Sequence, residues 1–183
     1  MFAKSIRFSL MKERLKKIKM LLLDVDGVLT DGRVIMQSND HEIIEFSIYD
    51  GVGIILLKKA GYKVGIISGR NSPIIHKRGE HLGIDEVHTN KFHKIDTYKE
   101  ILKKYNLKDE EICYVGDELL DLPLLERVGF SAAPANAIPE VKEKVDYVTE
   151  KEGGHGAVRE VIELILKETG QKEALLKKVL KYS

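Results

Sequence analysis

The chain has 183 residues, enough for one well-buried domain and too few for two of ordinary size. Its 30 Lys and Arg residues nearly balance 29 Asp and Glu residues, so the net charge is +1 and no general field attracts nucleic acid or a membrane. The single cysteine, Cys113, excludes an intrachain disulfide and lies in an apolar run, where we expect a buried, inert thiol. Small molecules or further copies of the chain are the expected partners.

The first 18 residues alternate Lys and Arg with apolar residues at helical spacing. This pattern predicts an amphipathic N-terminal extension over residues 1–18 that packs on the domain or on a partner. It lacks the continuous apolar stretch of a signal peptide, and no run in the chain has the length and apolarity of a membrane span. We therefore expect a cytoplasmic protein.

The remaining sequence alternates short apolar runs with helical patterns, which is typical of a parallel α/β sheet. We expect a Rossmann-like, doubly wound domain over residues 19–168 and a helical tail over residues 169–183. In chain order the expected elements are a strand at Met20–Leu23, a β-hairpin at Arg33–Tyr49, a helix at Gly53–Ala60, a strand at Val64–Ile67, a helix at Pro73–Leu82, a strand at Val87–His88, a helix at Lys94–Tyr105, a strand at Ile112–Val115, a helix at Leu119–Val128, strands at Phe130–Ala132 and Tyr147–Val148, and a helix at Ala157–Lys167.

The hairpin interrupts this alternation. It is expected to pair residues 33–37 with residues 43–49 through a turn at residues 38–41. A two-stranded ribbon is marginally stable alone, so its apolar face needs a partner. The alternation predicts that this face consists of Ile44, Phe46 and Ile48.

Acidic residues follow the first strand at the point where it must end. Asp24 and Asp26 point the same way because side chains alternate along a strand, and Gly27 lets the backbone turn behind them. Two parallel carboxylates repel each other unless a cation or a shared proton lies between them. A polar turn that only happens to contain aspartates is the alternative.

Further polar residues follow other strands, and the carboxyl ends of parallel strands gather at one edge of a sheet. Ser68, Gly69 and Arg70 precede a helix and suit an anion, although they could be a simple cap. Lys94 begins the next helix. Asp117 and Asp121 can share one helix face, and an oxygen-rich pocket made with the first two aspartates favours Mg²⁺.

The ordered set D-x-D-G-V-L-T-D, S-G-R, a lysine and G-D-x-x-x-D resembles the haloacid dehalogenase superfamily of phosphatases. The segment Gly153–Glu160 is similar to the G-G-x-G-A-V-R-E tail of 3-deoxy-D-manno-octulosonate 8-phosphate phosphatases, and the resemblance covers about residues 19–168. The chain departs from the usual pattern at His93, Glu118 and His155.

The resemblance implies Mg²⁺-dependent hydrolysis of this sugar acid phosphate, a step of lipopolysaccharide precursor synthesis. Asp24 would form an aspartyl phosphate, Asp26 would act as general acid and base, and Lys94 would neutralise charge. Ser68 and Gly69 would hold the phosphoryl group together with Lys94. The implied metal ligands are Asp24, the main-chain carbonyl of Asp26, Asp117 and Asp121, the last through water or by holding Lys94.

The resemblance also implies a capless enzyme that works as a homotetramer, in which hairpins of several subunits roof neighbouring sites. Arg70 and Arg78 are expected to face the sugar carboxylate. The tail, through Gly154, His155 and Arg159, is expected to close over the sugar from the same or a neighbouring subunit.

Three alternatives remain open at this point. The chain could be a sibling phosphatase for a nine-carbon sugar phosphate of the sialic acid type, although that group tends to carry Glu where this chain has Arg70. It could be a non-catalytic oligomeric regulatory module that retains the fold. A receiver-like phosphoacceptor domain also has acidic strand ends, but Asp26 would be surplus there.

Overall fold

The computed structural model describes residues 10–38 and 42–180 and contains a six-stranded parallel sheet with the order β5-β4-β1-β6-β7-β8. This confirms the expected α/β fold with one doubly wound sheet. The strands of the sheet are β1 (Met20–Leu23), β4 (Lys63–Ile67), β5 (Glu86–His88), β6 (Ile112–Val115), β7 (Phe130–Ala133) and β8 (Tyr147–Val148). The longer helices are α2 (Ile48–Lys59), α3 (Pro73–Leu82), α4 (Lys94–Tyr105), α7 (Ala157–Glu168) and α8 (Lys172–Leu180).

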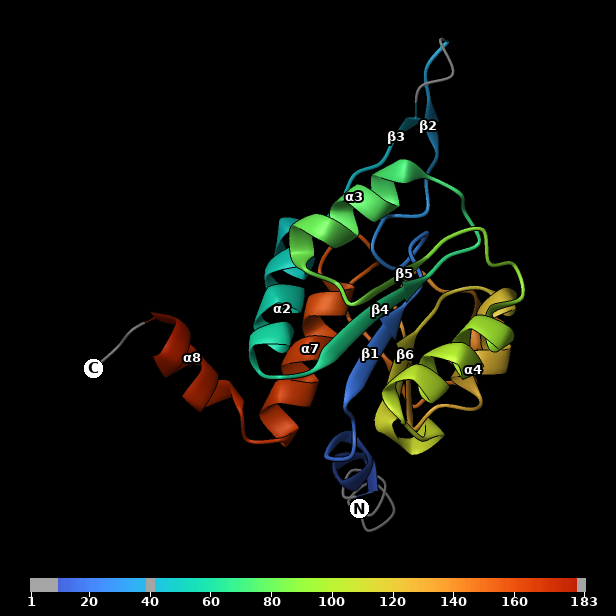
Figure 1. Ribbon diagram of the computed structural model, residues 1–183. Coiled ribbons are helices and arrows are strands. Elements are labelled where there is room, and N and C mark those ends of the chain that lie inside the picture. The colour runs from blue at the N-terminus through green and yellow to red at the C-terminus, as the bar shows by residue number, and fades with distance from the viewer. Residues whose placement is uncertain (1–9, 39–41, 181–183) are drawn as a thin grey trace.

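The central strand β1 divides the core into two layers. Leu21 and Leu23 belong to the cluster under α2 and α7, whereas Met20 and Leu22 belong to the cluster under α4. All four side chains are buried because helices cover both faces of the sheet (Figure 1). The continuous apolar run of β1 therefore reflects burial on both sides, and it fixes the register in which the following aspartates leave the sheet.

Helix α2 begins five residues earlier than the sequence pattern suggested. Ser47 precedes it and accepts a hydrogen bond from the backbone N–H of Asp50 (3.4 Å), which is the arrangement of an N-cap. Ile48 and Tyr49 consequently belong to the helix, so the expectation that residues 43–49 form a strand is wrong beyond Ile43. The N-cap at Ser47 therefore determined the local structure, and the alternation of apolar and polar residues over 43–49 did not.

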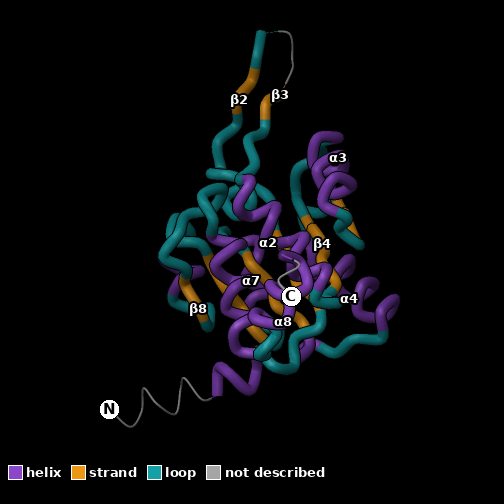
Figure 2. The backbone as a smooth tube through the Cα atoms, turned by 90° about the vertical axis from the view of Figure 1, so that its left-hand side faces the viewer, coloured by secondary structure: helices purple, strands orange, loops and turns teal. Residues whose placement is uncertain are grey.

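The hairpin itself is short. It pairs β2 (Ile35–Met36) with β3 (Glu42–Ile43) in antiparallel fashion and projects from the top of the molecule (Figures 1 and 2). Three of its predicted turn residues, 39–41, lie outside the described residues.

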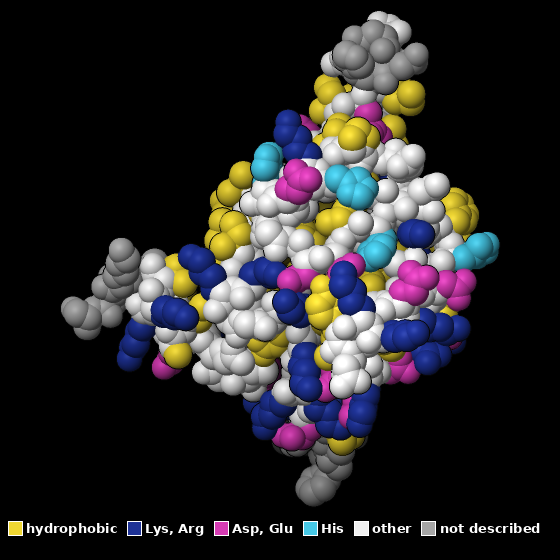
Figure 3. All heavy atoms as spheres, in the orientation of Figure 1, with side chains coloured by type: hydrophobic (Ala, Val, Ile, Leu, Met, Phe, Trp, Pro, Cys, Tyr) yellow, Lys and Arg dark blue, Asp and Glu magenta, His cyan; other side chains and the backbone are white. Residues whose placement is uncertain are grey.

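The apolar surface of the hairpin differs from the predicted one. Ile44 and Phe46 pack against the core of their own chain, so they are not the unpartnered face. The exposed apolar side chains of the hairpin lie closer to its tip, on both faces of the ribbon, and hydrophobic side chains are visible on both sides of the hairpin in Figure 3. We call this set the hydrophobic patch; it consists of Val34, Ile35, Met36 and Ile43.

The predicted helix over residues 119–128 is replaced by two short elements, the 3-10 turn η2 (Leu119–Asp121) and α5 (Leu122–Leu125). Pro123 lacks an N–H group, and the Asp121 carboxylate accepts hydrogen bonds from the backbone of residues 117 and 118. The remaining small elements are the 3-10 turn η1 (Asp109–Glu111) and α6 (Pro139–Lys142).

Both ends of the described chain pack on the domain. Residues 10–15 are helical, and Leu15 and Ile18 are buried in the layer under α2 and α7. Leu175 of α8 joins the same layer. Residues 1–9, which hold the first part of the predicted extension, lie outside the described residues. Among the described helices, none has the length and apolar character needed to cross a membrane.

We expect Leu15→Ala to destabilise the domain by about 2–5 kcal/mol, because it removes a fully buried side chain and leaves a cavity. The matched control is Leu10→Ala on the same helix, which should change stability by no more than about 0.5 kcal/mol because Leu10 is 61% exposed. Denaturant unfolding of both variants measures the difference. Equal stabilities would show that the helix is not part of the folding unit.

Candidate active site

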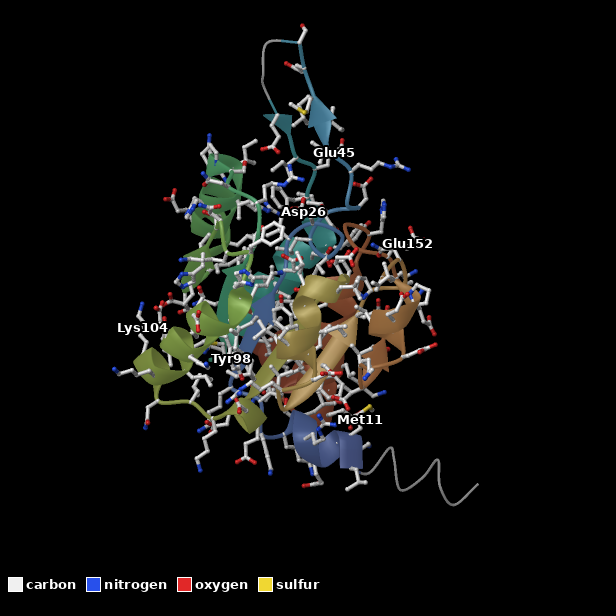
Figure 4. The ribbon with its side chains drawn as sticks, turned by 90° about the vertical axis from the view of Figure 1, so that its right-hand side faces the viewer. Met11, Asp26, Glu45, Tyr98, Lys104 and Glu152 are labelled. Carbon is white, nitrogen blue, oxygen red and sulfur yellow. The ribbon has the colours of Figure 1, made fainter. Side chains whose placement is uncertain are left out.

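A pocket of about 330 Å³ opens at the carboxyl ends of the strands, lined by the loops that follow β1, β4, β5 and β6. Asp26 lies just below the hairpin at this end, whereas Met11 marks the opposite end (Figure 4). A larger hollow of about 570 Å³, beside Ile18 and Tyr62, is lined by lysines, tyrosines and aliphatic side chains. We place the site in the smaller pocket, because the carboxylates gather there.

Lys94 is the centre of the pocket's charge network. Its Nζ lies 2.9 Å from Asp24 Oδ1 and 2.6 Å from Asp121 Oδ1, and only 5% of the residue is exposed. Burial alone would lower the pKa of Lys94, but the two carboxylates outweigh it and raise this pKa. The lysine therefore stays charged and joins the loop after β1 to the loop after β6.

Asp121 is fully occupied as a hydrogen-bond acceptor. Its Oδ1 also accepts from the Tyr114 hydroxyl (2.5 Å), and its Oδ2 accepts from the backbone N–H of Asp117 (3.0 Å) and Glu118 (3.2 Å). Of the two roles expected for Asp121, holding Lys94 is the one that this geometry supports.

Asp117 is the least satisfied acid of the pocket. Its Oδ1 is buried without a hydrogen-bond partner among the described residues, and its side chain lies so close to Gly27 that a Cβ there would sit 2.0 Å from Asp117 Oδ2. Burial, reinforced by the charges of Asp24 and Asp121, raises the pKa of Asp117 to about 8. Burial followed by the charge of Asp121 raises the pKa of Asp24 to about 6, although Lys94 opposes the shift.

These carboxylates fit a divalent cation. Oxygen atoms of Asp24, Asp117 and Asp121 lie within 4.8 Å of one another, and the unpartnered Asp117 Oδ1 is a ready ligand. All the donors are oxygen atoms, which favour a hard ion such as Mg²⁺. Asp24 and Asp117 could hold such an ion directly, while Asp121 is engaged with Lys94.

The second half of the pocket joins Asp26 to the segment after β4. Arg70 donates from Nε to Asp26 Oδ2 (2.9 Å), and its Nη2 lies 2.9 Å from Asp26 Oδ1. Arg70 also pairs with Glu42 of the hairpin. Ser68 is buried and accepts a hydrogen bond from the Arg70 N–H (3.1 Å), and Gly69 lines the pocket beside it.

The structure does not bring the other expected substrate residues into this pocket. Arg78 donates to the carbonyl of Ser47 (3.2 Å) and lies over the Phe46 ring, which makes it a packing residue of its own chain. Gly154 and His155 line a separate hollow of about 360 Å³, and Arg159 pairs with Glu163 on the surface of α7. Within one chain, these four residues do not line the pocket that contains Asp24, and their contact with a bound sugar stays a prediction.

The structure adds residues that the sequence pattern did not single out. Lys91 and Phe92 line the pocket from the loop after β5, where their place at a strand end was the available signal. Asn136 donates to the Gly27 carbonyl (3.0 Å) and accepts from the Gly153 N–H (2.7 Å). No local pattern indicated Asn136, because its partners lie 109 and 17 residues away.

Comparisons with known proteins agree with this fold. The family profile of haloacid dehalogenase-like hydrolases matches residues 83–162. The 3-deoxy-D-manno-octulosonate 8-phosphate phosphatase of Escherichia coli K12 is 40% identical over 156 residues, which is 85% of this chain and 83% of the relative. The phosphatase structure of that name from Yersinia pestis has a TM-score of 0.88 and 37% identity, covering 90% of this chain and 89% of the other.

A phosphatase of the same name from Moraxella catarrhalis, solved with magnesium, phosphate and KDO, has a TM-score of 0.90 and 35% identity and covers 92% of this chain and 97% of its own. The parallel sheet with acids at its strand ends defines a haloacid dehalogenase-like hydrolase. The identity and mutual coverage go further: the chain belongs to the 3-deoxy-D-manno-octulosonate 8-phosphate phosphatase family.

The raised pKa values of Asp24 and Asp117 predict how the metal-free protein responds to pH. The folded state retains protons that the unfolded chain releases above about pH 4, so stability should fall as pH rises from about 4 to about 8. Mg²⁺ should reverse the loss. Asp117→Asn should raise the Tm of the chelated protein at pH 8, by about 2–4 °C per kcal/mol relieved, and remove the response to Mg²⁺.

Differential scanning fluorimetry with a chelator or with Mg²⁺ measures these shifts. Asp96→Asn is the matched control, because the same charge is removed from a side chain that is 80% exposed on α4. A lower Tm for Asp117→Asn than for the wild type in chelator at pH 8 would contradict the prediction.

Proposed function

We propose that this chain hydrolyses 3-deoxy-D-manno-octulosonate 8-phosphate to the free sugar acid and phosphate through an aspartyl phosphate on Asp24. Its family membership supports the reaction class and the substrate. The observation that carries the assignment is the contact of buried Lys94 with both Asp24 and Asp121, which fixes a carboxylate nucleophile beside a permanent positive charge.

In the first step, the Asp24 carboxylate attacks phosphorus, and the bond to the sugar oxygen breaks. Asp26 protonates the departing oxygen and then removes a proton from the water that attacks the aspartyl phosphate, so that Asp24 is regenerated. Lys94 offsets negative charge on the nucleophile and on the transferred group. Ser68 and the backbone at Gly69 hold the phosphoryl oxygens.

Asp24, Asp117 and the Asp26 main-chain carbonyl would hold Mg²⁺, and the bound ion would supply the charge neutralisation that lets an anionic nucleophile approach an anionic ester. The Asp117 Oδ1 atom, buried without a partner in the described structure, supports this assignment. Asp121 serves the site by orienting Lys94.

A panel of sugar acid phosphates, assayed by released phosphate with and without Mg²⁺, tests the proposal. The octulosonate ester should be the preferred substrate, and chelation should stop turnover. Preference for a nine-carbon ester of the sialic acid type would establish the sibling activity instead. No hydrolysis of any ester with Mg²⁺ would establish a non-catalytic module.

Asp24→Asn should abolish turnover because it removes the nucleophile, and Asp26→Asn should lower kcat by about 10²–10⁴-fold, the range that general acid–base groups contribute. Asp96→Asn, an exposed aspartate of α4, is the control for the chemical change. Steady-state kinetics and circular dichroism on the three variants separate lost chemistry from lost folding. An Asp24→Asn enzyme with a tenth of wild-type activity would refute the covalent mechanism.

We propose further that the enzyme is a homotetramer whose hairpins meet. The hydrophobic patch of Val34, Ile35, Met36 and Ile43 supports this, because these side chains are exposed in the single chain on a two-stranded ribbon with free edges. The hairpin reaches the active site through Glu42 and Arg70, so its association with other subunits would roof the pocket. In such an assembly, His155 and Arg159 could face a neighbouring subunit's substrate.

Met36→Glu should dissociate the assembly and lower specific activity, because a charge enters the proposed interface at a side chain that is 71% exposed in the single chain. The monomer's own packing should be unaffected. Leu10→Glu, at an exposed apolar residue near the opposite end of the molecule, should leave the oligomer intact. Sedimentation velocity measures the oligomeric state of both variants and of the wild type. A fully active wild-type monomer would rule out the tetramer.

The division into an N-terminal extension over residues 1–18, a catalytic domain over residues 19–168 and a tail over residues 169–183 remains our proposal. Cytoplasmic localisation does as well. The thiol of Cys113 is free and fully buried, which is compatible with a reducing compartment.

A further inference from the structure

Arg70 is engaged on both sides of its guanidinium group. Its Nε and Nη2 atoms each lie 2.9 Å from a different oxygen of Asp26, so one edge of the fork holds the whole carboxylate. The remaining nitrogen, Nη1, pairs with Glu42. Glu42 is fixed in turn by the Ser72 hydroxyl, which donates to its Oε2 (2.8 Å).

This arrangement engages Asp26 with Arg70 instead of with a substrate. Asp26 Oδ2 accepts a charge-assisted hydrogen bond from Arg70 Nε, and Asp26 Oδ1 lies 2.9 Å from Arg70 Nη2, so the guanidinium group occupies both oxygens. To protonate the departing sugar oxygen, Asp26 must leave the fork. The same edge of Arg70 is also the one a substrate carboxylate would need, because Glu42 occupies the other.

We propose that the substrate's carboxylate displaces Asp26 from Arg70 and thereby releases Asp26 to act on the phosphate ester. This inference rests on the proposed function. One carboxylate replaces another on the same fork, so the charge pairing of Arg70 is conserved. Asp26 and Arg70 line one pocket together with Asp24, so a ligand with a phosphate and a carboxylate can reach both groups.

The consequence is that recognition of the carboxylate raises kcat as well as affinity. A phosphate ester without a carboxylate binds beside Asp24 but leaves Asp26 on Arg70, so it reacts slowly. Specificity of this kind needs no cap domain, because the wrong substrate fails to assemble the catalytic group.

The test supplies the substrate in two pieces. A pentose 5-phosphate carries the primary phosphate ester without a carboxylate, and pyruvate carries the 2-oxo acid end. Millimolar pyruvate should raise the wild-type kcat for the pentose ester roughly tenfold, part of the about 10²–10⁴-fold that a general acid or base contributes. Methyl pyruvate, which has no charge, should have no effect.

Arg70→Ala should hydrolyse the pentose ester at least as fast as the pyruvate-activated wild type, and pyruvate should no longer change its kcat. Its kcat/KM for the octulosonate ester should fall. Arg127→Ala is the matched control, because it removes an exposed arginine–aspartate pair near the opposite end of the sheet and should keep the pyruvate response. Thermal unfolding of both variants verifies that they fold.

The exchange is overturned if pyruvate leaves the wild-type kcat unchanged, or if Arg70→Ala lowers kcat for the pentose ester. Failure of the proposed function has a different signature. A wild-type enzyme that does not prefer the octulosonate ester refutes that substrate, whatever pyruvate does. A strong preference without a pyruvate response refutes the exchange alone.

Discussion

The buried ammonium group of Lys94 holds the site together. Without it, Asp24 and Asp121 would be two carboxylates withdrawn from water and repelling each other, which is a costly arrangement in a folded protein. With it, the loops after β1 and β6 are joined, and among the described residues of the pocket Asp117 keeps a buried oxygen without a partner. The remaining excess of negative charge is what a divalent cation can neutralise. The site is therefore stable enough to fold, and it still has negative charge that a bound cation would neutralise.

The sheet supplies the precision that this charge network needs. Backbone pairing places β1 between β4 and β6, so the segments carrying Asp24, Ser68 and Asp117 leave the sheet side by side. Because both faces of β1 are packed, its register cannot slip by one residue without exposing a core side chain. The distances among the polar groups are thus set by apolar packing that lies below them.

Much of this could be predicted from the sequence, because the signals were local. The bounds of β1, β6, α3 and α4 follow directly from apolar runs, glycine caps and the proline that begins α3. The hairpin was harder, since alternation on residues 43–49 competes with a helix cap at Ser47, and the cap prevails. The contacts of Arg78 could not be predicted for a similar reason: its stacking on Phe46 depends on how α3 packs, which no short motif encodes.

The glycine-rich tail shows most clearly what a motif alone leaves open. The sequence predicts that residues 153–159 close over a sugar, and the structure shows in addition that Gly153 and Gly154 contact the loop after β1. A Cβ at Gly153 would sit 1.8 Å from the Gly27 carbonyl oxygen, and Asn136 bridges these two glycines.

The first turn of α7 is anchored in turn by Asp50 of α2, whose Oδ1 accepts the Arg159 N–H (2.7 Å). Contacts therefore connect α2, through the first turn of α7 and the tail glycines, to the turn after β1 that positions Asp24 and Asp26. A side chain at position 153 would displace the Gly27 carbonyl in the turn that carries Asp24 and Asp26. The tail glycines thus shape the site within one chain, independently of any contact that they make with a neighbouring subunit.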